Sequence, residues 1–104
     1  MDRLECGIDI ETYSATDIAS GAYRYSEDPD FQVLLIGYKF SDEKEVTCLD
    51  CSGLTSADLP KKAPRLYLAL TGELDCLLTA YNANFERTCL AKWMGVPMPP
   101  EQWR

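Results

Sequence analysis

The feature that most constrains the fold is a pair of carboxylates in a segment that otherwise has the pattern of a buried strand. The segment reads Cys6-Gly7-Ile8-Asp9-Ile10-Glu11-Thr12-Tyr13. Side chains two positions apart on a strand project from the same face, so Asp9 and Glu11 point together, while the apolar residues between them point into the opposite layer. Two neighbouring carboxylates repel each other and resist desolvation, unless a divalent cation or a functional role compensates. The alternative is that Glu11 is solvated beyond the strand and Asp9 is hydrogen-bonded, because one short motif has a high false-positive risk.

The composition describes one soluble globular domain and excludes several kinds of site. The chain has 104 residues, 46% hydrophobic and 26% charged, with a formal net charge of −7 and no histidine. We expect it to be cytosolic, since it has neither a membrane-spanning stretch nor the pattern of a signal peptide. An acidic surface argues against non-specific phosphate binding but permits a nucleic acid held through metal ions. The lack of histidine excludes Ser-His and Cys-His catalysis and His-ligated zinc within these residues.

Five cysteines are scattered along the chain, and a cytosolic location predicts that they are reduced. Cys48-Leu49-Asp50-Cys51 has the spacing of half a zinc site or of a redox pair. Completing a zinc site would require Cys76 and Cys89, neither of which has a close partner in the sequence. We expect these two to fill core positions, as free cysteines usually do, so a zinc or thiol-redox module is the weakest functional hypothesis.

The hydrophobic pattern predicts an α/β order of elements. Residues 14–30 form a long polar connection, of a length that is usually functional or flexible. The elements expected after the first strand are a strand over 31–40 covered on both faces, a hairpin turn at 41–44, a strand over 45–49, an irregular stretch over 51–60, a helix from about 63 to 71, a strand over 74–80, and a helix from about Phe85 to Met94 that Asn84 caps and Gly95 ends. This order predicts a mixed sheet with flanking helices.

A second polar motif, Asn82-Ala83-Asn84-Phe85-Glu86, lies at the predicted junction between a strand and the last helix. Taken alone, Glu86 is an ordinary first-turn residue, because a carboxylate is electrostatically favoured at a helix start. The strand before it is expected to be a parallel neighbour of the Asp9 strand, joined through the intervening helix. Polar site residues gather at the carboxyl ends of adjacent parallel strands. We therefore expect Asp9, Glu11 and Glu86 to converge.

With both motifs in place, the chain resembles the DEDD 3′–5′ exonucleases, which have a ribonuclease-H-like fold. It is most similar to the proofreading domain at the N-terminus of phage-type family A DNA polymerases. Residues 8–14 are similar to the first exonuclease motif of that family, Asp-x-Glu, and residues 81–87 to the second, Asn-x-x-(Phe/Tyr)-Asp. The tail over 93–104, with Gly95-Val96-Pro97 and Gln102-Trp103-Arg104, is similar to the segment that succeeds the second motif in the phage branch.

The resemblance implies phosphodiester hydrolysis with two Mg²⁺ or Mn²⁺ ions about 4 Å apart. It implies that Asp9 bridges both ions, that Glu11 binds the ion on the water side, and that Glu86 holds the other ion. The positions of Thr12, Asn82 and Phe85 match those that contact the terminal nucleotide of a single-stranded DNA 3′ end, Phe85 by packing against the sugar or base.

The chain departs from the family pattern in two places. Glu86 stands where the family has aspartate, and no Tyr-x-x-x-Asp or His-x-x-x-Asp comes after it within these residues. We therefore expect residues 1–104 to be the N-terminal portion of an exonuclease domain, truncated after the second helix, with little or no activity by itself. Apolar surface left around Trp93, Met94 and Trp103 predicts a homo-oligomer that buries it.

A hypothesis of a different class is a non-catalytic remnant or interaction module that keeps the fold and has lost the chemistry. The truncation favours this hypothesis. The intact pair of Asp9 and Glu11 disfavours it, because no structural role explains two adjacent carboxylates on one strand.

Overall fold

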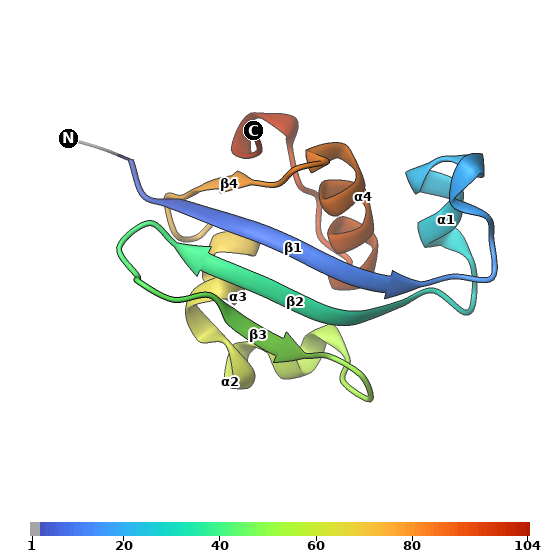
Figure 1. The fold of residues 1–104 in the computed structure, drawn as a ribbon, viewed down its shortest axis with the longest axis horizontal. Helices are drawn as coiled ribbons and strands as arrows, with labels where there is room; N and C mark the ends of the chain where they lie inside the picture. Colours follow the sequence, from blue (N-terminus) through green and yellow to red (C-terminus); the bar gives the residue numbers. More distant parts are fainter. Residues whose placement is uncertain (1–2) are drawn as a thin grey trace.

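A computed structural model describes residues 3–104, which form one mixed sheet with helices packed against it (Figure 1). The strands are β1 (Glu5–Tyr13), β2 (Gln32–Phe40), β3 (Thr47–Asp50) and β4 (Leu77–Thr79), in the sheet order β3-β2-β1-β4. The pairs β1–β2 and β2–β3 are antiparallel, and β4 runs parallel to β1. The predicted α/β class, the hairpin and the parallel neighbour of the Asp9 strand are confirmed.

The helices lie behind the sheet and beyond one of its ends (Figure 1). They are α1 (Ala22–Glu27), α2 (Leu59–Lys62), α3 (Pro64–Thr71) and α4 (Ala83–Met94), with short 3₁₀ helices η1 (Ile18–Ser20), η2 (Ser56–Asp58) and η3 (Pro100–Gln102). In Figure 1, α3 and α4 lie behind the sheet, and no helix among residues 3–104 lies in front of it. The prediction that β2 is covered on both faces is therefore wrong for this part of the chain.

The β1 strand separates apolar from acidic side chains as its alternation predicts. Cys6, Ile8 and Ile10 are buried, whereas Asp9 and Glu11 are exposed on the opposite face. The partner strand β2 reads as apolar on both faces because of an irregularity in the pairing, where Glu11 faces Leu35 and Thr12 faces Val33. The residue between Val33 and Leu35 has no partner on β1, as in a β-bulge. Because of this extra residue, Val33 and Ile36 both reach the core.

The capping residue of α4 differs from the prediction. Asn82, rather than Asn84, is the N-cap, and its side-chain oxygen accepts a hydrogen bond from the Phe85 backbone N–H at 3.4 Å. The two asparagines are both good caps, and the chain enters the helix earlier than the apolar pattern indicates. Gly95 ends α4 in the left-handed conformation at φ 69°, as predicted, because a residue with a side chain is strained there.

The long polar connection over residues 14–30 contains a helix that the sequence pattern does not reveal. Three hydroxyl side chains along the exit of β1 attach α1 and its end: Thr12 Oγ1 lies 2.9 Å from Tyr25 Oη, Ser14 donates to the Tyr25 carbonyl at 2.7 Å, and Thr16 donates to Asp28 at 2.6 Å. The expected strand over 74–80 is shorter, only Leu77–Thr79, and the stretch over 51–60 contains η2 and the start of α2.

The C-terminal tail returns to the sheet. Trp103 bridges Leu78 of β4 in a parallel sense, and the Arg104 backbone N–H donates to the Leu78 carbonyl at 2.8 Å. The Trp103 side chain is only 8% exposed. The prediction that Trp103 contributes to an exposed apolar surface is therefore wrong, because the tail uses it to cover β4; Trp93 and Met94 are half-buried.

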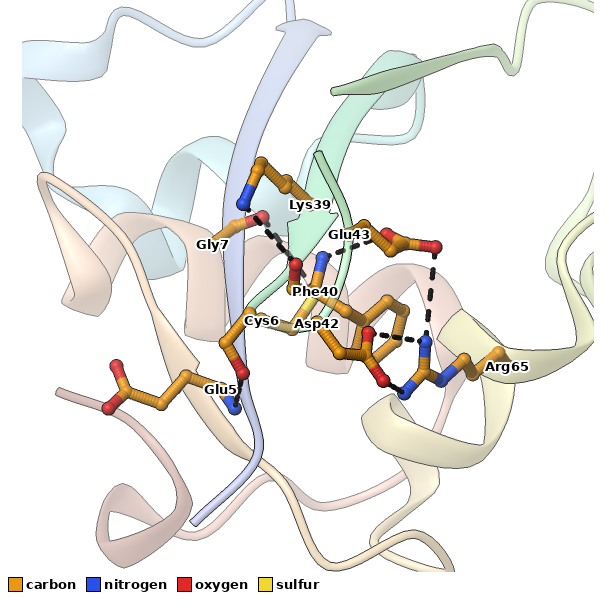
Figure 2. A network of polar contacts seen from close by, with 9 residues as sticks. Glu5, Cys6, Gly7, Lys39, Phe40, Asp42, Glu43 and Arg65 are labelled. Carbon is orange, nitrogen blue, oxygen red and sulfur yellow. Dashed lines mark hydrogen bonds and ion pairs between the residues drawn. The ribbon is translucent and has the colours of Figure 1, made fainter. Parts of the chain in front are cut away.

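An ion-pair network joins the β2–β3 hairpin to α3 (Figure 2). Arg65 donates to both carboxylate oxygens of Asp42, at 2.9 and 2.7 Å, and its guanidinium lies 4.1 Å from the centre of the Phe40 ring. Glu43 accepts a hydrogen bond from the Phe40 backbone N–H at 2.9 Å and lies 3.9 Å from Arg65. This network attaches the turn of the hairpin to α3, near the end of β1 that carries Glu5.

Within residues 3–104, no helix has the length and apolar character that crossing a membrane would require.

Candidate metal and nucleotide site

The candidate site lies where β1 extends beyond its parallel partner. Pairing between β1 and β4 ends at Gly7 and Thr79, so within residues 3–104 the edge of β1 from Ile8 onward has no strand beside it on that side. The chain turns after β4 and begins α4, which brings Glu86 back toward β1. Figure 1 shows that α1 stands at the same end, next to α4 and past the arrowhead of β1.

Glu86 is a buried carboxylate beside this free edge. It is only 6% exposed, and burial is the main cause that raises the pKa of its carboxyl above the ordinary value. The negative charge of Asp9 raises this pKa further, while the backbone N–H of Ile10 acts in the opposite direction. Glu86 is therefore a buried carboxylate beside β1 that also experiences the negative charge of Asp9.

The other two predicted acidic residues stand on the uncovered face of the sheet. Asp9 pairs across to Gly37, and Glu11 to Leu35, and both carboxylates are exposed. Within residues 3–104, no lysine or arginine lies within ion-pair distance of Asp9, Glu11 or Glu86. In the same part of the chain, no three acidic or cysteine side chains are grouped closely enough to hold a metal ion. Asp9, Glu11 and Glu86 therefore do not form a compact three-carboxylate group within residues 3–104.

The chemistry of these side chains fits a hard divalent cation. Carboxylate oxygens are the ligands that Mg²⁺ and Mn²⁺ select, and a cation would offset both the burial of Glu86 and its repulsion by Asp9. Asp9, Glu11 and Glu86 are the carboxylates of this region that could act as its ligands.

The three residues predicted to contact a nucleotide fall into two groups. Asn82 is exposed and caps α4. Thr12 and Phe85 are half-buried and meet through Tyr25 of α1, which reaches Thr12 with its hydroxyl and lies with its ring centre 5.7 Å from that of Phe85. Sequence reasoning missed Tyr25, because nothing in the polar 14–30 segment indicated a helix that presents an aromatic side chain to the core.

A shallow hollow of about 370 Å³ opens on the uncovered face beside Asp9. Gly7 and Gly37 form part of its floor, and Lys39, Val46 and Cys48 form part of its rim. Cys48 is exposed in this hollow, whereas Cys51, Cys76 and Cys89 are buried. The prediction that Cys76 and Cys89 fill the core is confirmed, and no cluster in residues 3–104 unites the cysteines into a metal site.

Comparison with known proteins relates the chain to a phage enzyme. No protein-family model matches the chain, and no solved structure matches it. The chain is 46% identical over 99 residues to a DNA polymerase of Bacillus phage SP02. The match covers 93% of this chain and 14% of that polymerase, so the chain spans a small part of its relative. The chain is therefore homologous to part of a phage DNA polymerase.

Proposed function

We propose that this chain is part of a metal-dependent 3′–5′ exonuclease domain of a DNA polymerase, with the first two of its motifs. The observation that supports the proposal is the buried carboxylate of Glu86 beside β1, where the negative charge of Asp9 helps to raise its pKa and no basic side chain of residues 3–104 forms an ion pair with either. The similarity to a phage DNA polymerase supports a role in DNA replication. The motifs around Asp9 and Glu86 support proofreading hydrolysis rather than nucleotide addition.

In this proposal, the acidic residues bind metal and the neighbouring residues hold the DNA end. Two bound Mg²⁺ or Mn²⁺ ions would supply a nucleophilic water at neutral pH and would neutralise charge on the phosphodiester. Asp9, Glu11 and Glu86 would hold these ions, and Phe85 would pack against the terminal sugar or base. Asn82 and Thr12 would contact the same nucleotide of a single-stranded 3′ end.

These residues contain no third motif after Glu86, so we expect weak or no hydrolysis from them alone. The test is therefore binding as well as cleavage. Fluorescence anisotropy with a 5′-labelled single-stranded oligonucleotide should show binding that requires Mn²⁺ and is lost in Asp9→Asn. Asp42→Asn is the matched control, because it removes an exposed carboxylate far along the chain from both motifs.

Two outcomes would overturn parts of this proposal. Failure of wild-type protein to bind the oligonucleotide at any Mn²⁺ concentration contradicts the nucleic-acid role. Rapid shortening of the labelled strand from its 3′ end by these residues alone would contradict the expectation that a further motif is needed, while it would support the nuclease assignment.

The second candidate is a non-catalytic module that retains the fold. One observation favours it, namely that Asp9, Glu11 and Glu86 do not form a compact three-carboxylate group within residues 3–104. A remnant of this kind should bind no divalent ion, and substitution of Asp9 should not change its stability.

A further inference from the structure

The structure joins the two halves of the candidate site through one side chain that neither motif contains. Tyr25 lies on α1, between the β1 motif and the α4 motif in sequence. Its hydroxyl oxygen is 2.9 Å from Thr12 Oγ1, and its ring centre is 5.7 Å from that of Phe85 and 5.9 Å from that of Phe31. Thr12 and Phe85 are far apart in the sequence, so Tyr25 couples two segments that the chain order separates.

We propose that Tyr25 is a positioning residue for the terminal nucleotide, acting through the Thr12 hydroxyl and the Phe85 ring. This inference rests on the proposed function, because Thr12 and Phe85 are nucleotide-contacting residues only within it. Either hydroxyl in the pair can donate. The greater acidity of the phenol favours donation from Tyr25 to Thr12, and in that arrangement the Thr12 proton is free to point toward a phosphate or sugar oxygen.

The attachment of α1 makes Tyr25 suitable for this role. Its own backbone carbonyl accepts a hydrogen bond from Ser14 at 2.7 Å, so the residue is fixed to the exit of β1 at both its main chain and its side chain. The next residue, Ser26, is buried, and its hydroxyl donates to the Tyr23 carbonyl at 3.0 Å. The tilted contact with Phe85, at 51° between the ring planes, limits the directions in which the Phe85 ring can turn.

The side chains that contact the Tyr25 hydroxyl and ring are uncharged, which fits a role in orientation rather than in proton transfer. Its hydroxyl is engaged by a neutral partner, and its ring packs on two phenylalanines. The Tyr23 side chain on the same helix offers a contrast, because it is 71% exposed and its hydroxyl bonds to Glu27, which raises its pKa. Tyr23 thus provides a matched control on the same short helix.

The test compares affinity for two short labelled oligothymidylates in Mn²⁺, one with a free 3′ hydroxyl and one blocked by a 3′ phosphate. Tyr25→Phe keeps the ring and removes the hydroxyl, so it should weaken binding of the free end about three- to tenfold, as expected for one lost hydrogen bond. Binding of the blocked strand should change less, and the melting temperature should stay near that of Tyr23→Phe.

A double-mutant cycle shows whether Tyr25 acts through Thr12. Thr12→Val should weaken binding of the free end, and adding Tyr25→Phe to it should weaken binding no further. Additive losses, or an equal loss for both oligonucleotides, would show a merely structural role for Tyr25 and overturn the inference. Binding by Tyr25→Phe equal to that of wild type would also overturn it and leave the proposed function intact, whereas no binding by wild type itself would remove both.

Discussion

The two ends of β1 differ in what surrounds their acidic side chains. At the Glu5 end, carboxylates have arginine partners, with Arg104 at 2.8 Å from Glu5 and Arg65 at 2.7 Å from Asp42. At the other end, Asp9, Glu11 and Glu86 have no such partner within residues 3–104. The carboxylates at the Glu5 end are thus engaged by the fold itself, whereas those at the other end have no basic partner within residues 3–104.

The largest expected difference between the two ends is in stability. Trp103→Ala should lower the free energy of unfolding by about 3 kcal/mol, because this buried side chain holds the tail against β4 near the Glu5–Arg104 pair. Tyr81→Ala, at the junction that leads into the candidate site, should change it by about 0.5 kcal/mol or less, since Tyr81 is fully exposed. Urea unfolding of both variants measures these free energies. Equal losses of unfolding free energy in the two variants would contradict the expectation that the Glu5 end contributes more to stability.

The next effect concerns Glu86 and has a definite dependence on pH. Its raised pKa means that the folded state binds its proton more tightly than the unfolded state does. The stability it contributes is therefore present below the unfolded pKa and is lost as pH rises through the folded pKa. Glu86→Gln should raise the melting temperature of the metal-free protein at neutral pH, and the gain should shrink on acidification. Melting temperatures of Glu86→Gln and wild type, measured from acidic to neutral pH, test this prediction. If the variant were less stable than wild type at neutral pH, the buried charge of Glu86 would not be destabilising and the prediction would be contradicted.

The smallest effect is expected from the paired end itself. Arg65→Met removes the ion pairs to Asp42 and Glu43 and the contact with the Phe40 ring, and the ion pairs are partly exposed. We expect a loss of about 1 kcal/mol or less, and a smaller one at high salt. Lys61→Met on the neighbouring helix is the control for loss of one exposed positive charge. A loss of several kcal/mol, unchanged by salt, would mean that this network stabilises far more than a surface ion pair.

The sequence was sufficient for the elements whose pattern is local and strong. The alternation of Ile8, Asp9 and Ile10 predicted the two faces of β1, and the Gly95 stop of α4 was predictable from its chemistry. The failures have physical causes. Asn82 and Asn84 are equally good caps by composition, and which one acts depends on where β4 ends. The burial of Trp103 comes from a tertiary contact with β4 that no local pattern contains.

The candidate site likewise has one part that the sequence predicts and one part that it does not. The parallel pairing of β4 with β1, which leads the chain into α4 beside the Asp9 strand, was predictable from the order of the elements. Tyr25 was not, because α1 is short and polar and is held in place by hydroxyl groups from β1 rather than by an apolar stripe of its own. Its position depends on side-chain contacts between segments, which periodicity does not encode.

Calorimetric titration of Mn²⁺ into the protein tests most directly whether the unpartnered acidic end of β1 is a cation site. Wild-type protein should bind the ion with measurable heat, Glu86→Gln should reduce the affinity at least about tenfold, and Asp42→Asn should leave it unchanged. Equal affinities for all three proteins, or no heat from wild type at millimolar Mn²⁺, would contradict the account.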